Sequence, residues 1–314
     1  MNTELQPIFL VGAERSGTTL LRLMLDFHPE LAFQNEFEYI TDEVGDSGQF
    51  PEMNGYRQWL AGHRIFQESG FTIDDQLDYR ALAHSFLEQK RTRDGKAQVG
   101  ATVHHNYQRL LYIWPEARFL KIVRDPRDVS RSTIGMGWAG NVWVGCDRWL
   151  AAERIWEDLK PKLDEDRYLE IRYESLIQNA EAELRTICKC LGVAVKEVMV
   201  SYADNSTYDL PDPKLVYQWK KKLSQEDVAR VEYKVGDLLE KRGYEPSGYP
   251  PIIVDAAAEQ ALIDESRRYC RRFRLKRYGL PLLLTNKVAK ALALKGLEAY
   301  CRARFNKIDR KYLK

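Results

Sequence analysis

Hydrophobic runs and amphipathic segments alternate along most of this chain. Four runs have the length and composition of buried strands: residues 7–12, 97–103, 118–123 and 167–173. Apolar residues recur at helical spacing elsewhere, which predicts helices over about residues 18–27, 56–68, 77–92, 147–163, 179–192 and 224–242, and another up to Trp114. This alternation predicts an α/β fold with three α/β/α layers and a central parallel sheet.

Two segments are too rich in turn-forming residues for regular elements. Residues 42–55 read as a loop, and residues 203–218, with two prolines, read as a long functional loop. After Pro251 the pattern becomes helical and basic, with a break near residues 279–281. We therefore predict one domain over residues 1–250 and a helical C-terminal extension over residues 251–314.

Charge is unevenly distributed although the net charge of the chain is only +2. Residues 255–314 hold 16 Lys and Arg against 6 Asp and Glu, a balance of +10, so the first 254 residues carry −8. The small net charge gives no nucleic-acid signature. The basic extension could contact an anionic membrane surface, bind an acidic substrate, mediate homodimer formation, or pack on the domain as a pair of helices with its arginines in water.

The five cysteines bear on the cellular compartment. Their number is odd and their spacing forms no disulfide framework, which favours a reducing environment. The N-terminus lacks a basic-then-apolar signal pattern, and no apolar stretch has the length of a membrane span. We expect a cytoplasmic protein, with the membrane surface as the alternative that the basic extension leaves open.

The segment "LVGAERSGTT" at residues 10–19 is the first candidate for chemistry. A glycine-rich turn between a strand and a helix forms an anion cradle, because backbone amides and the helix N-terminus point at the ligand. The usual phosphate loop carries lysine where this chain has Thr18. The cation of the loop in this chain is instead Arg15. The segment therefore favours binding of a donor that transfers an anionic group over binding of a magnesium-bound triphosphate. The alternative is a Gly/Ser turn that only connects a strand to a helix.

This loop resembles the 5′-phosphosulfate loop of sulfotransferases that use 3′-phosphoadenosine 5′-phosphosulfate (PAPS), closest in style to the tyrosylprotein and carbohydrate branch and its bacterial relatives. "ARFLKIVRDPRDVSRS" resembles the 3′-phosphate motif of the same family. "RYESLIQNAEAELRTICKCLGV" and "WKKKLSQEDVARVEYKVGDLLEKRGY" are similar to its later blocks, so the resemblance covers roughly residues 7–245.

The resemblance implies a P-loop-like fold and a PAPS-dependent enzyme without a metal. The reaction is sulfuryl transfer to a hydroxyl or amine acceptor, which could be a small molecule, glycan, lipid or peptide. It also implies the nucleotide-binding residues. The phosphosulfate would be held by Arg15, Ser16, Gly17, Thr18 and Thr19, and the 3′-phosphate by Arg124 and Ser132, with Tyr173, Trp219 and Lys220 near the nucleotide.

Several of these residues have plainer interpretations. "RDPRDVS" also reads as a well-capped helix, with Asp125 as the cap and Asp128 completing a capping box. Tyr173 would serve equally in core packing, and a lysine run such as the one beginning at Lys220 is commonly a solvated face. Trp219 is expected to stack on adenine if the functional interpretation holds.

Catalysis requires a group that removes the proton of the acceptor hydroxyl. The family register implies Glu36 as this base, and His104 as either an alternative base or a donor to the departing group. Arg15 and the backbone amides of its loop would stabilise the phosphate of the departing 3′,5′-bisphosphate. Many relatives carry a lysine in a Lys-Thr-Pro-like run where this chain has Ala101, and Lys96 lies at the opposite end of the strand. Acceptor pockets are expected from residues 36–75 and 137–147.

Two rival functions stay open on the sequence. An ATP-dependent phosphotransferase would use Asp125, at the end of a Walker-B-like strand, as its magnesium ligand, although the missing loop lysine argues against it. A non-catalytic nucleotide-binding or membrane-associated protein would explain Ala101 and the basic extension.

Overall fold

The computed structural model describes residues 6–205, 212–309 and 311 of the 314-residue chain. Its centre is an all-parallel sheet of five strands in the order β2-β3-β1-β4-β5. The strands are β1 (Ile8–Val11), β2 (Leu31–Glu36), β3 (Gln98–Val103), β4 (Arg118–Val123) and β5 (Tyr168–Arg172). Four of them confirm the predicted strands; β2 was not predicted.

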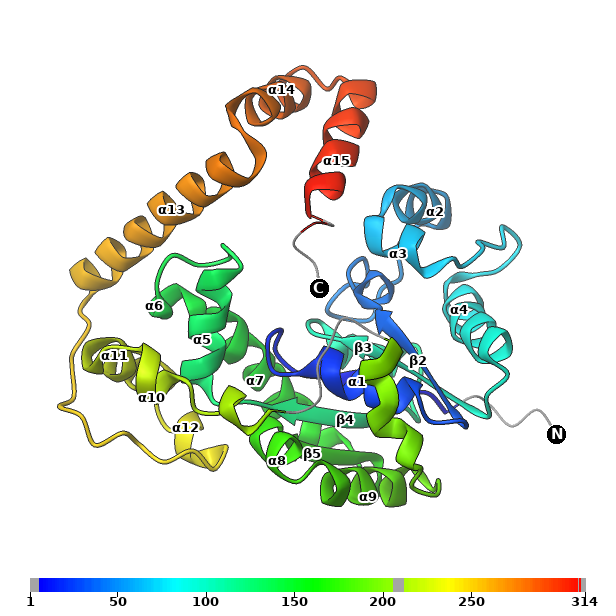
Figure 1. The fold of residues 1–314 in the computed structure, drawn as a ribbon. Coiled ribbons are helices and arrows are strands. Elements are labelled where there is room, and N and C mark those ends of the chain that lie inside the picture. The colour runs from blue at the N-terminus through cyan, green and yellow to red at the C-terminus, as the bar shows by residue number, and fades with distance from the viewer. Residues whose placement is uncertain (1–5, 206–211, 310, 312–314) are drawn as a thin grey trace.

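Helices cover both faces of the sheet (Figure 1). Along β1, Phe9 and Val11 enter one hydrophobic core while Ile8 and Leu10 enter the other, as the period of two requires. The first core includes α4 (Tyr79–Asp94) and α7 (Asp147–Leu159), and the second includes α1 (Thr18–Asp26), α8 (Tyr173–Gln178) and α9 (Ala180–Leu191). The predicted three-layer α/β/α fold is therefore confirmed.

Shorter elements complete the domain. The α-helices are α2 (Met53–Gly62), α3 (Arg64–Ser69), α5 (Pro126–Gly135), α6 (Val142–Gly145), α10 (Trp219–Lys222), α11 (Gln225–Val235) and α12 (Leu238–Lys241). The 3₁₀ segments are η1 (Glu38–Ile40), η2 (Tyr107–Tyr112), η3 (Lys160–Lys162), η4 (Glu165–Arg167), η5 (Glu197–Asn205) and η6 (Pro213–Leu215).

Local backbone geometry explains where the predicted helices differ. The chain leaves β3 through Asn106 at φ 55°, so the helix expected up to Trp114 is only the short 3₁₀ segment η2. Extended His63 divides the helix expected over residues 56–68 into α2 and α3. Gly236, at φ 55°, separates α11 from α12. The loop predicted over residues 203–218 contains part of η5 and all of η6, and its residues 206–211 lie outside the described part.

The C-terminal extension is helical, as predicted, and forms three helices where a single break would give two: α13 (Ala256–Tyr278), α14 (Leu280–Ala291) and α15 (Lys295–Asp309). We call these three helices the arm. The predicted break is found at Gly279, between α13 and α14. Figure 1 shows α13 leaving the domain beside α6, α14 at the far end, and α15 returning toward α3. The domain boundary at residue 250 stays a prediction.

Among the helices of the described residues, none combines the length and the apolar character that crossing a bilayer demands.

Candidate active site

Residues 12–19, which we call the anion loop, lead from β1 into α1 at the carboxyl edge of the sheet. Gly17 occupies the N-cap position of α1 at φ 94°, and a Cβ there would lie 2.3 Å from Cδ2 of Tyr173. Glycine is therefore required both for the turn and for the close packing of the Tyr173 ring. The first turn of α1 holds no acidic residue, and Gly17 supplies no capping side chain. The backbone thus presents an uncapped helix N-terminus, which favours an anion.

The hydroxyl groups of the loop differ in their surroundings. Ser16 is fully buried, and its Oγ has no hydrogen-bond partner within the described part of the chain. A buried polar group without a partner is costly unless a ligand or water satisfies it. Thr18, at the lysine position of a phosphate loop, lies with Oγ1 3.0 Å from Nε2 of His104. The loop therefore offers a hydroxyl donor that the protein itself leaves unused.

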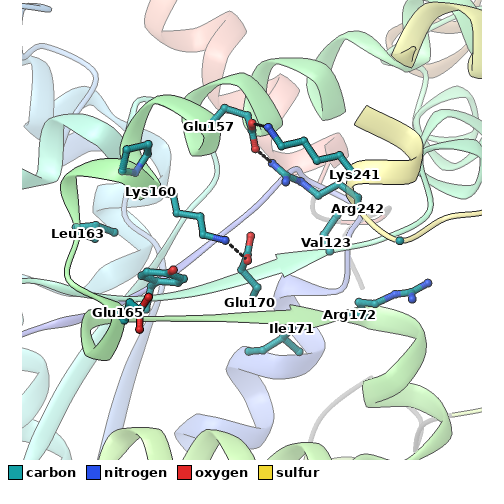
Figure 2. A pocket seen from close by; sticks show the side chains of 13 residues that line it. Val123, Glu157, Lys160, Leu163, Glu165, Glu170, Ile171, Arg172, Lys241 and Arg242 are labelled. Carbon is teal, nitrogen blue, oxygen red and sulfur yellow. Dashed lines mark hydrogen bonds and ion pairs between the residues drawn. The ribbon is translucent and has the colours of Figure 1, made fainter. Parts of the chain in front are cut away.

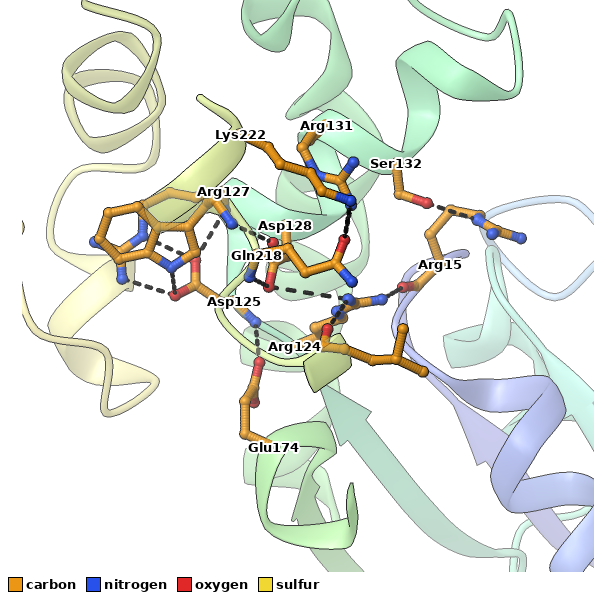
Figure 3. A network of polar contacts seen from close by, with 12 residues as sticks. Arg15, Arg124, Asp125, Arg127, Asp128, Arg131, Ser132, Glu174, Gln218 and Lys222 are labelled. Carbon is orange, nitrogen blue, oxygen red and sulfur yellow. Dashed lines mark hydrogen bonds and ion pairs between the residues drawn. The ribbon is translucent and has the colours of Figure 1, made fainter. Parts of the chain in front are cut away.

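The two sequence motifs meet at this edge, as Figure 3 shows. Arg15 Nε donates to Ser132 Oγ on α5 over 3.0 Å, and Arg124 Nη1 donates to the backbone oxygen of Arg15 over 3.1 Å. The guanidinium carbon of Arg124 lies 4.3 Å from the centre of the Tyr173 ring. Four predicted nucleotide-binding residues are thus brought together, and two arginines concentrate positive charge beside the loop.

Asp125 and Arg127 form a buried ion pair behind this edge. Arg127 donates from Nε to Oδ1 over 2.9 Å and from Nη2 to Oδ2 over 2.7 Å, and Trp219 Nε1 donates to Oδ2 over 2.9 Å. Asp125 is fully buried and also accepts from the backbone N–H of Arg127, so its predicted capping role is confirmed. Because both carboxylate oxygens already accept hydrogen bonds, the geometry does not favour Asp125 as a magnesium ligand.

The interpretation of Asp128 as part of a capping box is wrong. Its carboxylate accepts from the backbone N–H groups of Trp219, over 2.8 Å, and Gln218, over 3.2 Å. The backbone N–H of Asp125, which a capping box would satisfy, donates instead to Glu174 Oε1. Asp128 therefore fixes the start of α10 against α5, a long-range contact that local spacing does not reveal.

Trp219 and Lys220 lie at the start of α10. Trp219 is buried, and the guanidinium carbon of Arg127 stands 3.8 Å from the centre of its ring. Nζ of Lys220 lies 5.6 Å from the same ring. One face of the indole is thus occupied by Arg127, and the stacking of Trp219 on adenine stays a prediction.

Glu36 stands at the end of the unpredicted strand β2. The pairing of β2 with β3 shifts between Gln34 and Glu36, so one extra residue bulges out just before the carboxylate. Bulges of this kind turn a side chain away from the regular pleat. Burial and, after it, the nearby charge of Glu38 raise the pKa of Glu36. A raised pKa suits a carboxylate that removes and later releases a proton.

Glu38 and His104 form a buried pair that the sequence interpretation missed. Glu38 Oε1 lies 2.6 Å from His104 Nδ1 and also accepts from the His104 backbone N–H over 3.0 Å. Burial opposes the charge on His104, but the Glu38 carboxylate outweighs it and raises the pKa of the imidazole. Burial likewise acts against the charge on Glu38, yet contact with His104 lowers its pKa below the ordinary value.

The absent family lysine has no substitute on the same strand. Ala101 is buried within β3 and pairs with Phe9 of β1. Lys96 precedes β3 at the opposite end, where its Nζ donates to the backbone oxygens of Asp26 and Leu31. The next basic residue along the chain after the missing position is His104, which lies immediately after β3.

A separate cavity lies away from this edge of the sheet. It measures about 850 Å³ and includes Lys160, Glu170 and Arg242 in its lining, as Figure 2 shows. Two of its cations are already paired: Lys160 Nζ lies 2.6 Å from Glu170 Oε2, and Arg242 Nη2 lies 2.5 Å from Glu157 Oε1. None of the predicted site residues lines this cavity, so it does not carry the candidate chemistry.

Sequence comparisons identify relatives of this chain. The profile of the Sulfotransferase family matches residues 7–197. A protein-tyrosine sulfotransferase A of Caenorhabditis elegans is 25% identical over 272 residues, covering 78% of this chain and 68% of the relative. The omega-hydroxy-beta-dihydromenaquinone-9 sulfotransferase Stf3 of Mycobacterium bovis is 29% identical over 305 residues, covering 76% and 75%.

A solved structure supports the fold. The sulfotransferase domain of the Synechococcus PCC 7002 olefin synthase superposes with a TM-score of 0.54 at 21% identity, covering 75% of this chain and 97% of that domain. At this identity the likeness concerns the architecture of the sheet and its helices.

Proposed function

Because this chain belongs to the sulfotransferase family, we propose that it transfers a sulfuryl group from PAPS to a hydroxyl or amine group of an acceptor. The observation that carries the proposal is the junction of two anion-binding motifs at one sheet edge, with Arg124 donating to the backbone of Arg15. PAPS has a phosphosulfate and a 3′-phosphate on the same ribose, and therefore needs two neighbouring anion sites.

The residues present fit such a donor. The phosphosulfate would be held by the uncapped N-terminus of α1 and by Arg15, Ser16, Gly17, Thr18 and Thr19. The buried Ser16 hydroxyl, which has no partner among the described residues, supports this assignment because an anionic oxygen would satisfy it. Arg15 would exchange its contact with Ser132 for the donor.

The other end of the nucleotide would contact a second group of side chains. Arg124 and Ser132 are assigned to the 3′-phosphate, since both lie on the carboxyl side of β4 next to the anion loop. Tyr173 packs on Gly17 and beneath the Arg124 guanidinium, which supports its place beside the nucleotide. Trp219 and Lys220 are assigned to the same region on the sequence resemblance.

Glu36 is proposed as the general base. Sulfuryl transfer to an alcohol forms a bond from the acceptor oxygen to sulfur and breaks the bond from sulfur to the bridging oxygen of the donor, while the acceptor proton passes to the base. Partial burial and the neighbouring Glu38 charge raise the pKa of Glu36, which increases its affinity for that proton.

His104 is proposed to stabilise the departing nucleotide rather than to act as the base. Glu38 favours the charged imidazolium, and Nε2 points to Thr18 in the anion loop. A buried positive charge aimed at the loop would offset the negative charge that develops on the bridging oxygen. Glu38 acts through His104 and is therefore a positioning residue.

The pH profile tests this division of roles. Transfer requires Glu36 without its proton and His104 with its proton, so activity should fall below the raised pKa of Glu36 and above the raised pKa of His104. Glu38→Gln removes the carboxylate that holds the imidazole proton, leaving Glu36 and Glu14 as the acidic groups that act on His104. We expect the alkaline limit to move about one pH unit lower.

The control for this variant is Glu43→Gln, an exposed neighbour in the same segment. It should leave both limits unchanged. An alkaline limit that is the same in Glu38→Gln and in the original protein would contradict the assigned role of the pair.

Thermal denaturation with nucleotides tests the donor. Adenosine 3′,5′-bisphosphate should raise the melting temperature, because a ligand that binds only the folded state adds about 2.7 kcal/mol at a hundredfold excess over Kd. ATP with magnesium should have a much smaller effect, since the anion loop lacks lysine and both Asp125 oxygens are engaged. Equal or greater stabilisation by ATP with magnesium would instead support a phosphotransferase.

A further inference from the structure

The outer part of the arm combines exposed apolar residues with unpaired positive charge. On α14 and its C-cap, four apolar side chains recur at every fourth position and are each at least half exposed: Leu280, Leu284, Val288 and Leu292. Residues four apart lie on one side of a helix. We call these four residues the apolar ridge. Apolar side chains that share one exposed helix face commonly mark an interaction surface.

The charge around the ridge has one sign only. Residues 267–297 contain ten Lys and Arg and no Asp or Glu. We call the exposed cations of α13, α14 and the start of α15 the basic belt: Arg271, Arg272, Arg274, Lys276, Lys287, Lys290 and Lys295. Across the described residues, none of these seven forms an ion pair with a carboxylate. The belt therefore offers its charge to an external partner.

The arm is fixed to the domain at both ends, so the ridge is held outward. On α13, Ser266 Oγ accepts from the backbone N–H of Gly140 over 2.8 Å, and a Cβ on Gly140 would lie 2.6 Å from Cα of Ser266. At the other end, Arg302 on α15 donates to the backbone oxygen of Gly62 at the end of α2. Figure 1 shows α14 at the end of the arm away from the sheet.

From these observations we propose that the apolar ridge and the basic belt form a docking surface for an anionic lipid bilayer. The leucines enter the boundary between headgroups and acyl chains, and the cations contact anionic headgroups. A second copy of the chain would bring a basic belt against a basic belt, which is repulsive. A nucleic acid would satisfy the cations but leave the ridge in water.

Docking through the apolar ridge would also place a cavity that the arm lines close to the bilayer. A cavity of about 210 Å³ lies between the arm and the domain, with Arg64, Trp138, Phe273 and Tyr278 in its lining. The charge of Arg64 acts on Glu36, the proposed base. The arm thus bears the proposed docking surface around α14, and residues of α13 form part of the cavity wall.

Vesicle flotation with the full-length protein tests the proposal. The protein should bind vesicles of phosphatidylcholine mixed with phosphatidylglycerol, bind poorly to phosphatidylcholine alone, and dissociate as salt increases. A ridge variant, Leu280→Ser with Leu284→Ser and Leu292→Ser, and a belt variant, Arg271→Gln with Arg272→Gln and Lys287→Gln, should each bind at least about tenfold more weakly.

Matched controls separate the arm from a general surface effect. Val198→Ser with Val200→Ser removes exposed apolar residues on η5, and Arg185→Gln with Lys189→Gln removes exposed charge on α9; both should bind like the original protein. Stabilisation by adenosine 3′,5′-bisphosphate should be unchanged in every variant, which verifies the fold. Because bisphosphate stabilisation reports nucleotide binding and not vesicle binding, a failure of membrane docking can be told apart from a failure of the proposed transfer function.

Three outcomes would overturn the proposal. The original protein does not bind the phosphatidylglycerol vesicles; the ridge and belt variants bind as well as it does; or the ridge variant converts a dimer into a monomer in light scattering. The last result would identify a second copy of the chain as the occupant of the ridge.

Discussion

Glu36→Gln is expected to lower the rate of sulfuryl transfer by about 10²–10⁴-fold, the usual contribution of a positioned general base. Glutamine keeps the size of the side chain and its place after the β2 bulge, but it cannot accept the acceptor proton. Donor binding should be retained, because Glu36 belongs to the acceptor side of the proposed reaction. Initial rates with PAPS and a hydroxyl acceptor, together with bisphosphate affinity, measure the two effects separately.

Glu43→Gln is the matched control for this substitution. Glu43 is exposed and close in the chain, so the rate should stay within about twofold of the original. Full turnover by Glu36→Gln would show that the proton passes to another group, and His104 would then be the first residue to examine.

The second large effect is expected for Arg15→Ala. We expect bisphosphate affinity to fall about 10–100-fold, since hydrogen bonds to charged groups contribute about 1.5–3 kcal/mol each. Transfer should fall further, because Arg15 is also assigned to the charge that develops on the departing phosphate. Isothermal titration with adenosine 3′,5′-bisphosphate gives the affinity, and single-turnover rates give the catalytic part.

Two variants sharpen this experiment. Arg15→Lys retains the charge but loses the planar pair of donors, so it should recover only part of the affinity. Arg185→Ala removes an exposed arginine on α9 and should bind the nucleotide like the original protein. Unchanged donor affinity in Arg15→Ala would remove the anion loop from the proposed site.

The sequence predicted much of the framework because its signals are local. The buried run before Gly12, the helix after Gly17 and the apolar run ending at Val123 each follow from spacing and composition. Strand β2 was not predicted because only its first three residues, Leu31 to Phe33, are apolar and its second half is polar. Its identity depends on pairing with β3, and that contact joins residues more than sixty positions apart.

In the candidate site, too, residues in local motifs could be predicted, whereas contacts between distant residues could not. Arg15 and Arg124 were identified from their motifs, and the structure brings them together. Glu38 is one glutamate among many in the sequence, and only its contact with His104 distinguishes it. The interpretation of Asp128 as part of a capping box failed for a related reason: its real partner, Trp219, lies 91 positions away.

By itself, the sequence determined four of the five strands and most of the helices between them, the position of the anion loop and the concentration of basic residues after Pro251. These properties depend on neighbouring residues and on helical or strand periodicity. Tertiary structure alone decided which distant side chains become partners: Trp219 with Asp125 and Arg127, and His104 with Glu38 and Thr18. Such pairings arise because parallel strands bring distant segments to one edge, where burial strengthens each electrostatic contact.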